Sequence, residues 1–127
     1  MKSESWCVLI TGATRGIGRA LVDRWICMGH TVFGCGRSDT EINAMRSNYS
    51  DPHRFVAVDV ASGEEVMRWA DELLRNYGTP DLLVNNAGII NQNAPLWKIS
   101  EEEFSLLMRI NVGGMANVIR FFLPAMI

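Results

Sequence analysis

The chain has 127 residues, of which 48% are hydrophobic and 20% are charged, and its formal net charge is −2. This composition is that of a folded domain long enough to bury a core, and it excludes a disordered chain. No run of Lys or Arg forms a basic block, which argues against binding to nucleic acid or to an anionic membrane and favours a small-molecule partner.

Four short apolar runs rich in Val, Leu, Ile and Phe are predicted to form buried strands. The runs cover residues 6–10, 31–35, 54–58 and 81–85. A helix is predicted after the first run, with apolar residues at helical spacing from Ile17 onward and Gly29 as its C-terminal stop. The apolar positions of this helix are Ala20, Leu21, Trp25 and Met28.

Two further helices are predicted between the later strands. Residues 39–48 are a short candidate that Asp39 would cap. Ser62 and Glu65 have the spacing of a capping box and open the other helix, which ends before Gly78. The apolar stripe of that helix is Val66, Trp69, Ala70, Leu73, Leu74 and Tyr77.

A long helix is predicted near the end of the chain, opened by the capping-box pair Ser100 and Glu103. Its core-facing stripe is expected to contain Phe104, Leu107, Met108, Met115, Val118, Ile119 and Phe122. Asn111 falls on this stripe, where a buried amide needs partners. Gly113 and Gly114 follow, each about 1 kcal/mol less favourable than Ala inside a helix. They predict a local distortion or a close neighbour.

Strands and helices alternate along the chain, which predicts parallel strand pairing through right-handed crossovers. The expected fold class is therefore α/β, a doubly wound parallel sheet in a single domain over residues 1–127. In such a sheet the ligand crevice lies beyond the C-terminal ends of the strands. Functional residues are therefore expected directly after each of the four strands.

The first of these segments is "TGATRGIG", residues 11–18. Its glycine spacing differs from the G-x-G-x-x-G fingerprint, yet each glycine can do the same physical work. Gly12 would allow a tight exit from the strand, Gly16 a close approach to a pyrophosphate, and Gly18 close packing of the helix on the sheet. The helix N-terminus that follows offers free N–H groups to a phosphate. A plain glycine-rich turn is the alternative.

The second strand is followed by Arg37, where the fingerprint expects a carboxylate that binds ribose. Together with Arg15 of the glycine turn, Arg37 is expected to hold the 2′-phosphate of NADP, because a guanidinium fork suits a phosphate. Two alternatives stay open: both arginines are solvated loop residues, or Asp39 binds a ribose hydroxyl. We expect NADP(H) to be preferred over NAD(H).

The third and fourth strands end in Asp59-Val60 and in "NNAG", residues 85–88. Asp59 and Val60 would meet an adenine amino group and ring, although Asp59 is equally suited to a turn or cap. Two adjacent Asn side chains at a buried strand end need partners. Asn85 is expected to bond to neighbouring backbone, and residues 86–88 to contact the ligand.

Together, these motifs resemble those of the short-chain dehydrogenase/reductase family, in the same order and over nearly the whole chain. They are Thr11-Gly12-x-x-x-Gly16-Ile17-Gly18, Asp59-Val60, Asn85-Asn86-Ala87-Gly88 and "INV" at 110–112. The resemblance implies a Rossmann-type sheet of strand order 3-2-1-4 and an NADP-dependent oxidoreductase that moves hydride between the nicotinamide and a carbonyl or alcohol substrate. It assigns cofactor binding to Gly12, Thr14, Arg15, Gly16, Ile17, Gly18, Arg37, Ser38, Asp59, Val60, Asn86, Ala87 and Gly88.

The resemblance also assigns a catalytic role to Asn111, as a member of the family's tetrad at a helix kink that holds a water. A buried amide that only fixes packing is the alternative. The rest of the tetrad, a Ser and a Tyr-x-x-x-Lys pair, is missing. Tyr49 and Tyr77 both precede Asn111, and their fourth neighbours are His53 and Asp81. The 127 residues alone are therefore expected to be inactive.

The chain ends on the apolar segment "RFFLPAMI" within the predicted helix. Because a complete doubly wound fold is roughly twice as long, we interpret the sequence as an N-terminal half, truncated after the helix that carries Asn111. The fourth strand would then be an open sheet edge, and Leu106, Ile110, Gly113 and Phe121 would form a row that the family uses for subunit pairing. The alternative is a genuinely short, non-catalytic nucleotide-binding or dimerising module.

Cys7, Cys27 and Cys35 follow no metal-binding or redox spacing, so no metal site is expected. All three are interpreted as buried thiols of a protein in a reducing compartment. The start, "MKSESWCVLITG", is too short and too acidic for a signal peptide or a membrane span. A soluble cytoplasmic protein, homo-oligomeric in its full-length form, is the expectation.

Overall fold

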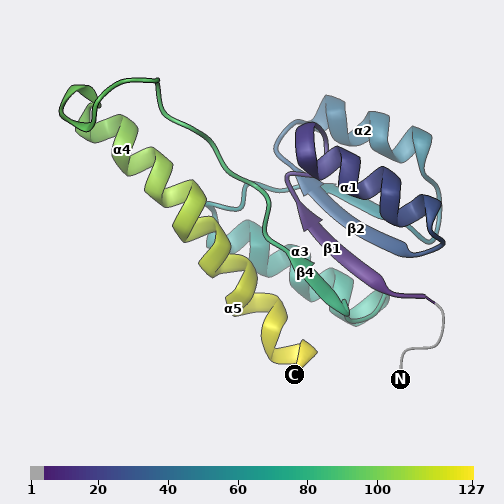
Figure 1. Cartoon of the computed structure of the whole chain (residues 1–127). Helices are drawn as coiled ribbons and strands as arrows, with labels where there is room; N and C mark the ends of the chain where they lie inside the picture. Colours follow the sequence, from purple (N-terminus) through teal and green to yellow (C-terminus); the bar gives the residue numbers. More distant parts are fainter. Residues whose placement is uncertain (1–4) are drawn as a thin grey trace.

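A four-stranded parallel sheet with helices on both faces forms the body of the protein, seen in a computed structural model that describes residues 5–127 (Figure 1). The strand order is β3-β2-β1-β4, and all three neighbouring pairs are parallel. The predicted doubly wound sheet is thereby confirmed. Residues 1–4, part of the start that was judged unlike a signal peptide, lie outside the described residues.

All four predicted strands form, and each end lies within one residue of its predicted place. Their bounds are β1 Cys7–Thr11, β2 Thr31–Gly36, β3 Arg54–Ala57 and β4 Leu82–Val84. Residues 8–10 of β1 are fully buried. Both faces of this strand are covered, which explains why its sequence is continuously apolar rather than alternating.

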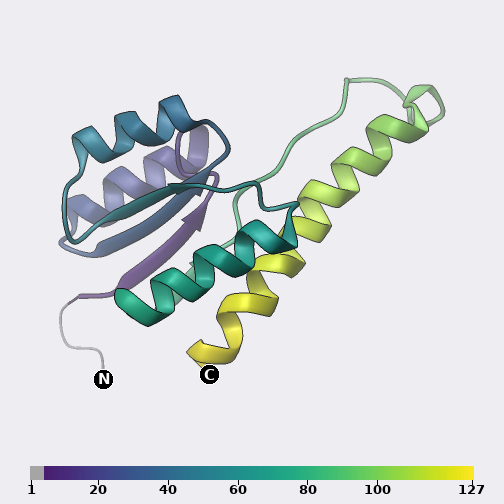
Figure 2. The ribbon, with the colours of Figure 1, turned by 180° about the vertical axis from the view of Figure 1, so that it is seen from behind.

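Two helices cover each face of the sheet (Figures 1 and 2). On one face lie α1 (Gly16–Cys27) and α2 (Asp39–Asn48), and on the other α3 (Gly63–Asn76) and α5 (Met115–Met126). Successive strand residues point to opposite faces, so Val8 and Ile10 join the core under α1 and α2, whereas Leu9 joins the core under α3 and α5. The sheet thus separates two apolar cores.

Helix α1 begins and ends close to the predicted places, and its predicted apolar face is confirmed in part, because Leu21 and Trp25 pack against the core. The buried residues are Gly18 and Val22, whereas Ala20 is exposed and Met28 is 52% exposed beyond the last turn. Gly29 follows with φ +90°, which confirms it as the C-terminal stop.

Serine side chains cap α2 and α3. The cap of α2 is Ser38, whose hydroxyl accepts a hydrogen bond from Glu41 N at 3.2 Å, so the prediction that Asp39 caps this helix was wrong. Ser62 caps α3 as predicted and accepts from Glu65 N at 3.3 Å. The buried stripe of α3 is Val66, Trp69, Ala70 and Leu73. The Ser-x-x-Glu spacing therefore located the start of α3 correctly.

The long C-terminal helix contains the distortion that its glycines predict. A short 3-10 turn (Leu96–Lys98) leads into α4 (Glu101–Met108), and a π-helical segment, Arg109–Gly114, joins α4 to α5. We call this segment η2. Close packing against Val60 explains why residue 114 is a glycine, because a Cβ on Gly114 would lie 2.6 Å from Val60 Cγ2. The α4 end projects from the body as an arm (Figure 1).

The buried face of this long helix was predicted incorrectly in part. Its buried residues are Ile110, Gly114, Val118 and Phe122. Of the predicted core stripe, Phe104, Met108, Met115 and Ile119 are exposed. Ile110, expected in the outer row, is only 5% exposed. The π-helical segment changes the helical phase, and the projecting α4 has little of the body beneath it, so a single 3.6-residue period misplaces these side chains.

Residues Glu101–Met126 form a continuous helix that is long and apolar enough to cross a membrane by length and composition alone. Val118 and Phe122 of this helix are nevertheless fully buried in the core below the sheet, where the Phe122 ring meets Trp69 edge-on at 5.1 Å between centroids. The α5 part therefore packs against the body, although only 22% of the most apolar window of the helix is buried.

Candidate functional site

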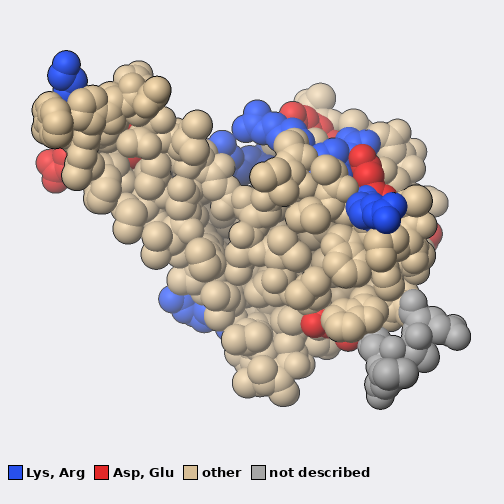
Figure 3. All heavy atoms as spheres, viewed as in Figure 1, with Lys and Arg blue, Asp and Glu red and all other residues tan. Residues whose placement is uncertain are grey.

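A cleft of about 600 Å³ lies at the C-terminal ends of the strands, the place that the fold class predicts. The surface is hollowed between the α4 arm and the end formed by α1 and α2 (Figure 3). The volume is in the range of small-molecule sites. Ten predicted residues line the cleft: Gly12, Thr14, Arg15, Gly16, Arg37, Ser38, Val60, Asn86, Ala87 and Gly88.

The structure also adds residues to the cleft and leaves some predicted ones outside its lining. The added residues are Cys35, Gly36, Thr40, Glu41, Val58, Ile89 and Ile110. Ile17, Gly18, Asp59 and Asn111 are not among the lining residues. The apolar additions come from strand ends, from the loop after β4 and from η2; only Ile110 belongs to a motif named above, and no cofactor contact was predicted for it. Only the tertiary fold brings them to the cleft.

The glycine turn after β1 has the geometry that its spacing predicts. Gly12 and Gly16 have φ of +65° and +59°, a region that side chains disfavour. A Cβ on Gly18 would lie 1.8 Å from the Gly12 carbonyl oxygen. Nothing lies within 4 Å of the place where a Cβ would be on Gly16. The turn therefore leaves open space at the start of α1, as a cradle for a ligand requires.

The N-terminus of α1 differs from those of α2, α3 and α4. Helices α2, α3 and α4 each begin with a capping serine and have acidic residues in the first turn. Helix α1 has no side-chain cap and no acidic residue in its first turn. Its first N–H groups and positive dipole end, beginning at the cleft residue Gly16, are thus left for an anion.

Thr11 and Asn86 join the ends of β1 and β4. The Thr11 hydroxyl accepts hydrogen bonds from Asn86 N at 3.0 Å and Ala87 N at 2.9 Å. The Asn86 side chain donates to the carbonyl oxygens of Thr11 and Gly12 at 3.2 and 3.0 Å. The backbone tie predicted for Asn85 is therefore made by Asn86, because Asn86 lies beside the glycine turn. Thr11 is 1% exposed, and a polar residue directly after an apolar run was the only sequence signal for this junction.

Arg15 and Arg37 enter the cleft from two different segments, the glycine turn and the end of β2. Both are exposed, and neither guanidinium has a hydrogen-bond or ion-pair partner among residues 5–127. Two unpaired guanidinium groups in one cleft suit a phosphate. Asp39, the alternative ribose ligand, is not a lining residue, whereas Glu41 of the same helix is.

Asp59 makes the contacts of a turn residue. Its carboxylate accepts from Ala61 N at 3.0 Å, and its carbonyl oxygen accepts from Ser62 N at 2.9 Å. Val60 lines the cleft, and its carbonyl oxygen accepts from the Asn117 side chain at 2.9 Å. Val60 is therefore a cleft residue and Asp59 is not, and the adenine contacts assigned to both stay predictions.

Asn111 connects η2 to the loop after β4. Its Oδ1 accepts from Ile89 N at 2.8 Å, and its Nδ2 donates to Ile89 O at 2.7 Å. A Cβ on Gly88 would lie 3.0 Å from Asn111 Oδ1, so the loop passes close to this amide. Both amide atoms bond to the backbone of the cleft residue Ile89, and a direct role of Asn111 in catalysis stays a prediction.

The reactive side chains near the cleft are few. Cys35 lines it and is 1% exposed, and burial raises the pKa of its thiol to about 12, so this thiol stays protonated and unreactive near neutral pH. Tyr49 and Tyr77 line other parts of the molecule. Within residues 5–127, no group of three or more His, Cys, Asp or Glu is arranged to hold a metal ion.

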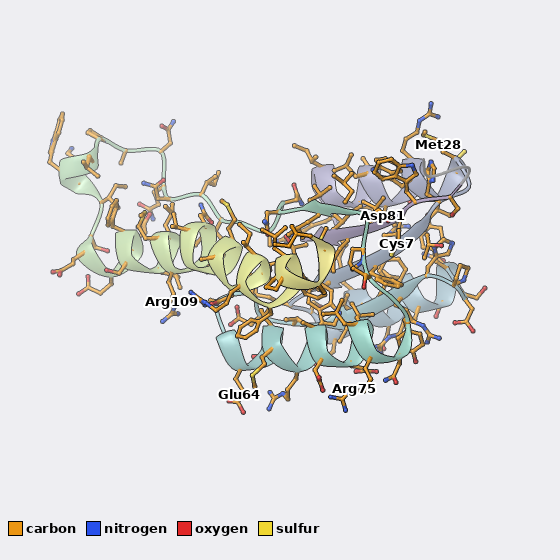
Figure 4. The ribbon with its side chains drawn as sticks, turned by 90° about the horizontal axis from the view of Figure 1, so that it is seen from below. Cys7, Met28, Glu64, Arg75, Asp81 and Arg109 are labelled. Atoms are coloured by element: carbon orange, nitrogen blue, oxygen red, sulfur yellow. The ribbon has the colours of Figure 1, made fainter. Side chains whose placement is uncertain are left out.

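The other two cysteines, Cys7 and Cys27, are less buried than predicted. Cys27, predicted to be buried, is exposed because it lies at the last turn of α1, and Cys7 is half-buried. The backbone N–H of Cys7 donates to Asp81 Oδ2 at 2.8 Å, and Asp81 N donates to Cys7 O at 2.7 Å (Figure 4). These bonds join the start of β1 to the start of β4, at the opposite end of the sheet from the cleft.

The fold and the cleft define a doubly wound α/β protein of the Rossmann type. The family model described as short chain dehydrogenase matches residues 6–127, and the chain belongs to this family. The NADPH-dependent pterin aldehyde reductase of Arabidopsis thaliana is 43% identical over 122 residues, which are 94% of this chain and 50% of that protein. The NADP-dependent 3-hydroxy acid dehydrogenase of Escherichia coli K12 is 30% identical over 120 residues, 94% of this chain and 48% of that protein.

Solved structures agree with this family. A short-chain dehydrogenase from Streptomyces avermitilis superposes with a TM-score of 0.87 at 32% identity, covering 98% of this chain and 45% of that one. Serine dehydrogenase from Escherichia coli has a TM-score of 0.88 at 30% identity, covering 94% of this chain and 56% of that one. The chain thus spans about half the length of the curated relatives and solved structures it matches.

Proposed function

We propose that this chain is the cofactor-binding half of an NADP(H)-dependent short-chain dehydrogenase/reductase that acts on a small carbonyl or alcohol. The observation that carries the proposal is the uncapped N-terminus of α1 in a cleft that also holds the unpaired guanidinium groups of Arg15 and Arg37. The first suits a pyrophosphate and the second a 2′-phosphate. The NADPH dependence named for the plant relative supports the same preference.

The proposal gives each part of the cleft a task. The turn at Gly12 and Gly16 and the first turn of α1 would hold the pyrophosphate, and Val60 would lie against the adenine. Asn111 would act as a positioning residue, because its amide holds the loop at Gly88 and Ile89. When bound, the nicotinamide supplies or accepts the hydride.

The catalytic Ser and the Tyr-x-x-x-Lys pair would come from a part of the protein outside these 127 residues. A tyrosine proton and a nearby ammonium are what carbonyl reduction needs in addition to a hydride donor. The substrate pocket would lie there as well. An aldehyde is the first substrate to test, because the 43% identical relative is named for one.

The cofactor preference can be tested by replacing Arg37 with Asp. The wild-type protein is expected to bind NADPH more tightly than NADH, and Arg37→Asp is expected to reverse the order. Loss of a charged hydrogen bond to the phosphate is worth about 1.5–3 kcal/mol, or roughly 10- to 100-fold in the dissociation constant. Isothermal titration calorimetry measures both affinities without any need for catalysis.

Arg75→Asp is the matched control, because Arg75 lies on the exposed face of α3, beside Asp71 and away from the cleft. It changes the net charge by the same amount and is expected to preserve the wild-type order. Equal affinities of the folded wild-type protein for NADPH and NADH would refute the assignment of Arg37.

The alternative is a short, non-catalytic nucleotide-binding module. Measuring the intact mass of the protein from its natural source distinguishes this alternative from the proposal. A mass near 14.2 kDa would favour the short module. A mass about twice as large, with Tyr-x-x-x-Lys encoded after Ile127, would support the oxidoreductase. The 127-residue chain alone is expected to reduce no aldehyde with NADPH, and turnover by the purified chain would contradict this assignment of the catalytic groups.

A further inference from the structure

Glu41 places a carboxylate in the part of the cleft that the proposal assigns to the 2′-phosphate. It lies in the first turn of α2 and lines the cleft together with Arg15 and Arg37. The residue was not among those predicted to bind the cofactor. Ser38 and Glu41 have the Ser-x-x-Glu spacing that places Glu41 in the first turn of a helix, but this spacing does not reveal that the Glu41 side chain lines the cleft.

A hydrogen bond fixes the Glu41 carboxylate in this position. Thr14 Oγ1 donates to Glu41 Oε2 at 3.0 Å, linking the glycine turn to α2. Thr14 itself is held close to β2, since a Cβ on Gly36 would lie 2.7 Å from Thr14 Cγ2. The backbone of Glu41 is fixed as well, because its N–H donates to the Ser38 hydroxyl at 3.2 Å.

The cleft is therefore lined by groups of opposite charge, the guanidinium groups of Arg15 and Arg37 and the carboxylate of Glu41. Basic and acidic side chains are interleaved over the part of the surface formed by α1 and α2 (Figure 3). A 2′-phosphate is attracted by the guanidinium groups of Arg15 and Arg37 and repelled by the Glu41 carboxylate. A free 2′-hydroxyl group can instead donate a hydrogen bond to that carboxylate.

We infer that Glu41 is a specificity-determining residue that narrows the preference for NADP over NAD, and that Thr14 is the positioning residue that keeps its carboxylate in the cleft. The inference rests on the proposed function, because it requires the 2′-phosphate to bind beside Arg15 and Arg37. It adds a repulsive group to a site for which the motifs predict only attractive ones, and specificity depends on both.

The test compares two adenosine ligands that differ only in the group at the 2′ position, adenosine 2′,5′-bisphosphate and adenosine 5′-monophosphate. Binding of each to the protein at its natural length is measured by calorimetry. Glu41→Gln removes the negative charge. It is expected to lower the dissociation constant of the bisphosphate by about three- to tenfold and to change that of the monophosphate by less than about twofold. The gain should shrink as salt is added, because exposed charges are screened.

Two further variants separate charge from other effects. Glu41→Asp keeps the charge, so its ratio of bisphosphate to monophosphate affinity is expected to stay near that of the wild-type protein. An equal gain in bisphosphate affinity in Glu41→Asp and Glu41→Gln would overturn the electrostatic explanation. Glu102→Gln removes the same charge from the exposed start of α4 and is expected to change neither affinity. A gain in Glu102→Gln equal to that in Glu41→Gln would show an effect of net charge alone and overturn the inference.

The outcomes also distinguish the inference from the proposed function. If the wild-type protein binds the two ligands equally, the assignment of the 2′-phosphate site fails, and the inference fails with it. If the wild-type protein prefers the bisphosphate and Glu41→Gln does not increase that preference, the proposed function stands and the inference is wrong.

Discussion

Gly18 lies where the first turn of α1 crosses the Gly12 carbonyl group, with too little space between them for a side chain. A Cβ on Gly18 would lie 1.8 Å from the Gly12 carbonyl oxygen and 2.6 Å from the Asn86 side-chain nitrogen. The same nitrogen donates to Thr11 and Gly12, so a small group at residue 18 preserves the junction of β1, β4 and α1. Close packing at this one residue therefore holds the first turn of α1 against the ends of β1 and β4.

We predict that Gly18→Ala destabilises the protein by about 3 kcal/mol, the upper end of the usual range for overpacking, because the added methyl group must displace backbone rather than a flexible side chain. Chemical denaturation measures the change in the free energy of unfolding. Gly63→Ala is the control, since its nearest neighbour to the added Cβ is 3.6 Å away. It is expected to be neutral or to stabilise by up to about 1 kcal/mol. Equal effects of the two substitutions would contradict the packing at Gly18.

His53 provides a pH-dependent contact in the folded protein. Its Nδ1 accepts from Val32 N at 3.2 Å, and burial lowers the pKa of the imidazole from its usual 6.5. The unfolded chain therefore takes up this proton at a higher pH than the folded chain. The stability contributed by neutral His53 is complete above about pH 6.5 and is lost as the pH falls through the lowered pKa.

We therefore predict that acidification from about pH 7.5 to pH 5.0 lowers the free energy of unfolding less in His53→Asn than in the wild-type protein. The Asn side chain keeps an oxygen that can accept a hydrogen bond but does not titrate in this range. Urea denaturation at several pH values gives the two curves. Parallel curves would show that His53 does not couple protonation to folding.

At the scale of elements, the π-helical segment η2 brings the long C-terminal helix into contact with two loops of the cleft. Asn111 in this segment bonds to the loop after β4, and Gly114 lets the segment approach Val60, which follows β3. Just after it, Asn117 donates to the Val60 carbonyl oxygen. π-Helical segments often lie at functional sites. Here the distortion allows one helix to bind two loops that both line the cleft.

Two adjacent glycines give a direct test of this alignment. A Cβ on Gly114 would lie 2.6 Å from Val60 Cγ2, but on Gly113 its nearest neighbour would be 3.9 Å away. Gly114→Ala is expected to destabilise the protein by about 1–3 kcal/mol through overpacking. Gly113→Ala is expected to stabilise it by up to about 1 kcal/mol through helix propensity. Thermal and chemical denaturation of both variants measure these changes, and the reverse order would contradict this packing.

At the scale of the whole molecule, two apolar surfaces stay open. Strand β4 is an outer strand of the described sheet, pairs only with β1 within residues 5–127, and is half-buried throughout. The long helix exposes Met115, Ile119 and Leu123 by 38–44%. Apolar helix stripes and open sheet edges promote association with other surfaces. Under the proposed function, the second half of a doubly wound fold or a second subunit would cover them.

We predict that the 127-residue chain self-associates and that replacing both Met115 and Ile119 with Glu reduces the association. The two side chains are exposed, so the double variant is expected to keep a cooperative unfolding transition. Size-exclusion chromatography with light scattering measures the change. Val118→Glu is the control, because Val118 is fully buried, and it is expected to abolish folding. A monomeric wild-type chain would refute the prediction.

By itself, the sequence determined the alternating strands and helices, the parallel sheet, the glycine turn and most of the cleft lining. These features depend on local chemistry: apolar runs, capping serines, and glycines whose conformation other residues disfavour. The tight turn predicted at Gly12 and the close packing predicted at Gly18 agree with the backbone geometry, while the pyrophosphate contact of Gly16 stays a prediction. The distortion at residues 113 and 114 was predicted for the same reason.

Only the tertiary structure decided which polar groups meet. Asn86 rather than Asn85 bonds to the glycine turn, Ser38 rather than Asp39 caps α2, and Glu41 enters the cleft. It also decided which face of the last helix is buried, because a π-helical segment changes the phase that a regular period assumes. A choice between neighbouring residues depends on where two distant segments approach each other, and local sequence contains no measure of that distance.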